Sequence, residues 1–176
     1  MHWDDYVTAV IDDLEMQAEG LQLAEREEDV TALAVAAYAE VDLAARWAAA
    51  PDVEVRVGFV DGTSLDGTVR RAGRGWLLLD ALAGPAIVLT DAVASVRGLP
   101  GAAISDGARG LPARLGVGTA LRALGEDRCR CLLRSRGGGR VDGVVERVGR
   151  DFVEVGSTAG AIVLPFAALL VVQEVP

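Results

Sequence analysis

Two stretches of the chain alternate apolar with polar or small residues at a period of two. Val55, Val57 and Phe59 do so in the first stretch, and Cys131 and Leu133 do so in the second. This period is typical of strands with one buried face. Glycine-rich turns end both stretches, and further short apolar runs follow each of them. The pattern therefore predicts two groups of short strands.

The two groups are copies of one unit. When the chain is shifted so that Gly62 falls on Gly138, eleven of the 35 positions between Gly62 and Val96 are identical, and no gap is needed. Each copy holds five strand patterns, with a one-turn helix before the last. A glycine in the second strand, Gly67 or Gly143, stands where a small sheet must bend sharply. Each copy thus predicts a five-stranded SH3-like or Sm-like barrel.

Helical patterns precede both copies. The segments 41–49 and 115–124 are alanine- or leucine-rich and overlay at the same shift. Nearer the N-terminus, 3–19 reads as an amphipathic helix and 30–47 as a second helix. This arm either packs on its own barrels or pairs with a partner or a second copy as a short coiled coil.

The predicted fold class is α+β: an N-terminal α-helical arm followed by two tandem five-stranded antiparallel barrels, each preceded by a short helix. The predicted domains are the acidic arm (1–40), barrel repeat 1 (41–99), a linker (100–114) and barrel repeat 2 (115–176). The linker has the glycine and proline content of a flexible connection.

Charge is concentrated in the arm. Residues 1–50 hold twelve acids and two arginines, a net charge of −10, whereas the remainder carries fifteen arginines and fourteen acids, a net charge of +1. The arm should therefore repel polyanions. No run of about 18 apolar residues is present and the first residues are acidic, so we expect a cytoplasmic protein that does not enter a membrane.

The residues needed for common catalytic sites are missing. The only histidine is His2, and the chain has no lysine for a phosphate-binding loop. Asp66 and Asp142 precede the bend glycines and read as a turn or a solvated strand face. Cys129 and Cys131 read as free thiols, because a metal site would need further ligands. We expect no enzymatic activity, no cofactor and no metal.

One charged pattern is a candidate nucleic-acid site. Alternation on a strand places several arginines on one face, opposite Cys129, Cys131 and Leu133. They form either a phosphate-binding stripe or a solvated face balanced by Glu126, Asp127 and Asp142. The tentative site consists of Arg128, Arg130, Arg134, Arg136 and Arg140.

The motifs resemble the Sm-like superfamily, and within it the Hfq-like RNA chaperones of bacteria. The resemblance rests on VRVGFVDGTSLDGTVRRAGRGWLLL and AIVLTDAVASV, and covers 41–99 and 115–175. It implies barrels joined edge to edge in six-membered rings, which a tandem chain could imitate with three copies or avoid by pairing its own two barrels. The layout is also similar to uncharacterised actinobacterial proteins sometimes labelled Fis-type regulators, although no basic recognition helix is present here.

The chain departs from the Hfq-like pattern at its binding residues. That family binds uridine-rich RNA with a Lys-His pair, and the matching positions here are Thr90-Asp91 and Phe166-Ala167. We therefore expect a non-enzymatic binding or scaffold protein. It would engage a protein partner, or itself, through the arm or the barrel edges. The alternative is an RNA- or DNA-binding regulator that uses the arginine stripe.

Overall fold

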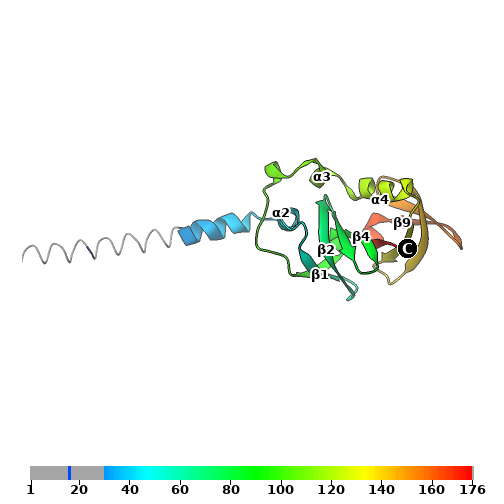
Figure 1. The fold of residues 1–176 in the computed structure, drawn as a ribbon, viewed down its shortest axis with the longest axis horizontal. Helices are drawn as coiled ribbons and strands as arrows, with labels where there is room; N and C mark the ends of the chain where they lie inside the picture. The colour runs from blue at the N-terminus through cyan, green and yellow to red at the C-terminus, as the bar shows by residue number, and fades with distance from the viewer. Residues whose placement is uncertain (1–15, 17–29, 176) are drawn as a thin grey trace, which may run out of the picture. The chain divides into compact units, whose positions relative to one another are not determined.

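The computed structural model describes residue 16 and residues 30–175. The chain divides into two units, Met1–Val41 and Asp42–Pro176. In the first unit, residues 30–39 are helical. The amphipathic helix predicted over 3–19 lies outside the described residues, apart from Met16. The second unit contains both copies of the internal repeat (Figure 1).

The elements of the second unit follow the repeat closely. Three pairs of strands, β1 with β6, β3 with β8 and β4 with β9, begin and end at positions that the repeat shift aligns, so the predicted duplication is confirmed in the structure. Repeat 1 (41–99) contains α2 (Leu43–Ala48), β1 (Glu54–Phe59), β2 (Ser64–Gly73), β3 (Trp76–Ala81), β4 (Gly84–Leu89), η1 (Thr90–Ala92) and β5 (Val93–Arg97). Repeat 2 (115–176) contains α4 (Val117–Glu126), β6 (Arg130–Ser135), β7 (Arg140–Val148), β8 (Phe152–Ser157), β9 (Gly160–Pro165), η3 (Phe166–Ala168) and β10 (Leu169–Glu174).

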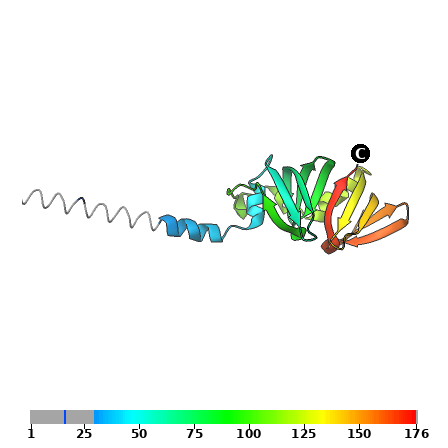
Figure 2. The same cartoon turned by 90° about the horizontal axis from the view of Figure 1, so that it is seen from below.

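The ten strands form one antiparallel sheet in the order β5-β1-β2-β3-β4-β10-β6-β7-β8-β9. The repeats meet where β4 pairs with β10, with Val88 opposite Val171 and Ile87 opposite Val172. Figure 2 shows β10 (red) at the boundary between repeat 1 and the yellow β6.

This topology corrects the predicted fold class. An α+β fold with an N-terminal helical arm and two separate five-stranded barrels is wrong, because the protein is mostly β, with one open ten-stranded sheet and short helices. The physical reason is the pairing of edges. Strand β4 leaves unpaired backbone groups at the edge of repeat 1, and β10 satisfies them, so the two halves merge into one sheet.

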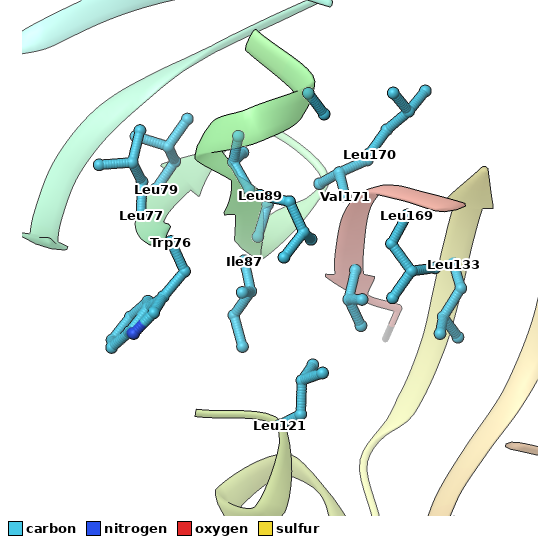
Figure 3. Packing of buried hydrophobic residues seen from close by; sticks show 14 of the residues in the cluster. Trp76, Leu77, Leu79, Ile87, Leu89, Leu121, Leu133, Leu169, Leu170 and Val171 are labelled. Atoms are coloured by element: carbon cyan, nitrogen blue, oxygen red, sulfur yellow. The ribbon is translucent and has the colours of Figure 1, made fainter. Parts of the chain in front are cut away.

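The two repeats also share one hydrophobic core. Buried residues from β3 and β4 belong to the same cluster as residues from β6, β8 and β10. Figure 3 shows Leu121 pointing from α4 toward these strands, with Ile87 of repeat 1 and Leu133 of repeat 2 both in view. Leu121 and Val88 have no exposed surface. The junction is therefore a packed interior rather than a contact between two surfaces.

The helix predicted over 30–47 is interrupted. Residues 40–42 are not helical, and α2 begins afresh at Leu43. Asp42 adopts an extended backbone, and its Oδ1 accepts a hydrogen bond from the Ala45 amide at 2.5 Å. An aspartate in this place is a favourable helix N-cap, which explains why the new helix starts there.

The segment between the repeats is held against repeat 1 at several points. The Ile104 amide donates to the Ala45 carbonyl, and the Arg74 amide donates to the Leu115 carbonyl. Helix α3 (Leu111–Arg114) packs on β2. The short helix η2 (Asp106–Ala108) lies in the same segment. The segment between the repeats therefore follows a defined path along repeat 1, although its glycine and proline content is typical of a flexible linker.

Gly67, where the sequence predicts a bend, is a point of close approach between two strands. A Cβ at Gly67 would lie 2.7 Å from the Asp80 carbonyl oxygen on the neighbouring strand β3. Only glycine allows the two backbones to approach so closely.

In the described part of the chain, no helix has the length and apolar character to cross a membrane.

Candidate functional site

The two outer strands of the sheet are the most distinctive surface of the second unit. Within the described residues, β5 pairs only with β1, and β9 pairs only with β8. Each therefore presents one row of backbone N–H and C=O groups without a strand partner. Such rows are templates for pairing with another chain.

The β9 edge is apolar where an edge strand is usually protected by charge. Val163 is 57% exposed, and Ala161 and Pro165 are exposed beside it. The repeat places Ile87 of β4 at the position equivalent to Val163, yet Ile87 is only 4% exposed. Ile87 lies in the core that the two repeats share, next to the junction of β4 with β10, whereas no described strand pairs with the outer side of β9. The β9 edge therefore resembles the edge that β4 offers to β10 in the internal junction, but it has no strand partner in the described structure.

The β5 edge is the matching half. Its equivalent in repeat 2 is β10, whose residues Leu169–Val172 are all buried against β4 and β6. In β5 the corresponding pattern is partly exposed, with Ala94 and Ser95 open to solvent. The molecule thus ends in two different edges, one of the β4 kind and one of the β10 kind, which are complementary within its own structure.

The five arginines of the predicted stripe differ in the contacts that their side chains make. Arg130 makes two hydrogen bonds to Asp142, at 2.8 and 2.9 Å, on the exposed face of the sheet. Arg134 reaches the other repeat and donates a hydrogen bond to Thr63 Oγ1. Two of the five candidate side chains are therefore engaged inside the molecule.

The remaining three arginines lie in different settings. Arg128 precedes β6 with a positive φ of 51°, and its side chain is exposed. Arg136 lies in the turn after β6, with its Nε buried and without a hydrogen-bond partner in the described structure. Arg140 is exposed and stands opposite Arg134 in the pairing of β6 with β7. The nucleic-acid prediction for this set stays a prediction.

The equivalent aspartates Asp66 and Asp142 are both ion-paired, although by different partners. Arg56 bonds Asp66 at 2.6 and 2.8 Å from the directly opposite position, whereas Arg130 reaches Asp142 diagonally. In each case the arginine hydrogen bond is the main cause that lowers the pKa of the carboxyl. These carboxylates stabilise a solvated strand face, one of the roles that their sequence positions predicted.

The cysteines are free thiols, as predicted. Cys129 is half-buried and Cys131 is buried, with the Cys131 Sγ 3.4 Å from the Cys129 carbonyl oxygen. Burial raises the pKa of Cys131 to about 11. Among the residues that the structure describes, no three His, Cys, Asp or Glu side chains gather as a metal site.

A cavity of about 510 Å³ lies between α2, the turn after β2 and α3. Arg74, Arg109 and Arg114 line it together with Asp42. Arg109 donates a hydrogen bond to Asp42 Oδ1 at 2.8 Å, so part of the positive charge is balanced. Sequence reasoning missed this cavity because it depends on how the segment between the repeats folds back.

Sequence reasoning also missed Val163 as an exposed edge residue. The alignment of the repeats pairs it with Ile87, and both fit an apolar strand equally well. Only the order of the strands shows that Ile87 lies on an inner strand and Val163 on an outer one.

No family model matches this chain, and no curated protein matches its sequence.

Proposed function

We propose that this protein is a non-enzymatic scaffold whose copies join head to tail, with β9 of one copy pairing with β5 of the next. The observation that carries the proposal is the contrast between Ile87 and Val163. They hold the same place in the two repeats, but one is 4% and the other 57% exposed. An exposed apolar edge strand promotes aggregation in a monomeric protein, but it is a binding surface in a protein that assembles.

The internal junction supplies the register of the proposed contact. Val172 stands opposite Ile87 where β10 meets β4. Replacing each residue by its equivalent in the other repeat places Val96 of one copy opposite Val163 of the next, with Ser95 opposite Leu164. The pairing would satisfy the open backbone groups and cover the apolar row on β9.

The contact joins two different surfaces, so it repeats from copy to copy. Such heterologous contacts close into a ring when the rotation between copies allows it, and otherwise extend as a filament. The resemblance to the Sm-like superfamily favours closure with three copies, each bringing two repeats. We place the assembly in the cytoplasm, where the free thiols of Cys129 and Cys131 would remain reduced.

Sedimentation velocity on the full chain, across micromolar concentrations, tests the proposal. We expect concentration-dependent association of the wild type, and Val163→Lys should weaken it by about tenfold because a charged side chain blocks an edge. Leu82→Lys is the matched control. Leu82 is also an exposed apolar residue, but it lies in the turn between β3 and β4, neither of which is an outer strand of the sheet.

Two results would overturn the proposal. One is a wild-type chain that sediments as a monomer at every concentration. The other is association that Val163→Lys leaves as strong as Leu82→Lys does. The second result would direct attention to the N-terminal unit, where Val30, Leu33 and Val35 are exposed on the helical residues 30–39.

A further inference from the structure

A chain with two edges of each kind can form four different junctions. The edges β4 and β9 are of one kind, and β5 and β10 are of the other. The structure uses β4 with β10, and the proposed assembly uses β9 with β5. The remaining two combinations would join like repeats and disturb the order of the copies. Something must therefore distinguish the internal junction from the others.

Arg134 makes a set of contacts that crosses the internal junction. It lies on β6 of repeat 2, and its side chain is only 17% exposed. Its guanidinium donates to Thr63 Oγ1 and lies 3.9 Å from a carboxylate oxygen of Asp61. The same guanidinium stands 5.4 Å from the centroid of the Phe59 ring. We call Arg134, Phe59, Asp61 and Thr63 the clasp.

The acceptor side of the clasp is held by hydrogen bonds within repeat 1. The Thr63 hydroxyl donates to Asp61 Oδ1 at 2.6 Å, and the Thr63 amide donates to the same oxygen at 2.9 Å. The hydroxyl can then accept from Arg134. These bonds from Thr63 are the main cause that lowers the pKa of Asp61, so the carboxylate stays charged beside the guanidinium. A cation over an aromatic ring adds a further attraction at this distance.

The clasp has no counterpart in the repeat. The position equivalent to Arg134 is Gly58. The positions equivalent to its three partners are also small, namely Ser135, Gly137 and Gly139. A junction of β9 with β5 would therefore have neither half of the clasp. A junction of β4 with β5 would lack the arginine, and a junction of β9 with β10 would lack its acceptors.

We infer that Arg134 is a specificity-determining residue, which confines the tight junction to β4 with β10 and leaves the junction between copies weaker and reversible. This inference rests on the proposed head-to-tail function and adds what controls it. The building block is then a fixed pair of repeats, and assembly and disassembly occur only at its outer edges.

The first test measures amide hydrogen exchange in the full chain. Arg134→Ala should increase exchange at the paired residues of β4 and β10 by about tenfold, because it removes the contacts that hold the junction closed. Arg130→Ala is the matched control, since Arg130 lies on the same face of β6 but pairs within repeat 2. Equal effects of the two variants on this junction would overturn the inference.

The second test builds the ion pair of the clasp into the junction between copies. Gly137 has open space around it, and a Cβ at Gly58 would meet only the Ser95 side chain within 3 Å, a hydroxyl that can rotate away. The double variant Gly58→Arg, Gly137→Asp should lower the dissociation constant for self-association by about tenfold, whereas each single variant should not.

The outcomes separate the two proposals. If the wild type associates but the double variant does so no more tightly than either single variant, the inference about the clasp is overturned and the scaffold function stands. If the wild type never associates but Arg134→Ala alone loosens β4 and β10, the scaffold function is overturned, and the role of Arg134 in closing the internal junction is supported.

Discussion

The indole nitrogen of Trp76 donates a hydrogen bond to the Leu115 carbonyl oxygen at 2.8 Å. Trp76 begins β3 of repeat 1, and Leu115 lies at the end of the segment that leads into α4 of repeat 2. Next to this bond, the Arg74 amide donates to the same carbonyl group. A buried side chain of one repeat thus fixes the point where the chain enters the other.

We expect Trp76→Phe to reduce the free energy of unfolding by about 1–2 kcal/mol more than Trp47→Phe does. Both changes remove the same atoms from a buried tryptophan, but Trp47 Nε1 has no hydrogen-bond partner in the described structure. Urea unfolding followed by circular dichroism measures the difference. Equal costs for the two variants would show that the bond to Leu115 contributes nothing.

Gly67→Ala should destabilise the protein by about 1–3 kcal/mol, because the new methyl group would press against the Asp80 carbonyl and force β2 and β3 apart. Gly101→Ala is the control, since nothing lies within 4 Å of a Cβ built at that position. Its effect should stay within about 0.5 kcal/mol. Thermal unfolding compares the two variants, and a tolerated alanine at position 67 would contradict the close approach of β2 and β3 at this glycine.

The ion pairs on the strand faces should make stability depend on acid pH. Hydrogen bonds from Arg56 and Arg130 lower the pKa of Asp66 and Asp142 in the folded protein. Their stabilisation is therefore complete above the unfolded carboxyl pKa of about 4, and is lost as the pH falls through the lower folded values.

The double variant Asp66→Asn, Asp142→Asn should then lose less stability than the wild type between neutral and acid pH. Urea midpoints measured over this range provide the comparison. Asp151→Asn serves as the control, because the Asp151 side chain is exposed and makes no ion pair in the described structure. A double variant with the full acid sensitivity of the wild type would argue against the two ion pairs.

The Cys131 thiol should be unreactive toward alkylating reagents in the folded protein. It is fully buried, and burial raises its pKa to about 11, so its thiol is protonated at neutral pH. In Cys129→Ser, which retains only Cys131, we expect no reaction with iodoacetamide under native conditions and complete reaction after unfolding. Rapid labelling of the native variant would contradict the packing of β6.

Ionisation of the same thiol should lower the stability of the folded protein at alkaline pH. Because the folded pKa lies above the unfolded value of about 8.5, the contribution of the protonated thiol is complete below that value and declines as the pH rises toward 11. Cys131→Ala should flatten the alkaline limb of the stability curve, as measured by urea midpoints. An unchanged limb would show that other groups control it.

The amino-acid sequence by itself determined the repeat and the elements within it. The constant shift between the copies, the period of two and the turn glycines predicted the strands, and the structure places β1 and β6 at equivalent positions. Mid-strand Gly67 was also predictable, since a glycine among apolar alternation indicates a bend or a close approach. These features are local, so neighbouring residues are sufficient to specify them.

The tertiary structure alone decided how the repeats are joined. Ile87 and Val163 fit the same strand pattern, but Ile87 is buried in the core shared by the two repeats, whereas Val163 is exposed on the outer strand β9. Arg134 reads as one member of an arginine stripe in the sequence, but it contacts Phe59 from the other repeat. Strand pairing between residues far apart in the chain depends on which edges meet, and the period of a single strand carries no information about its partner.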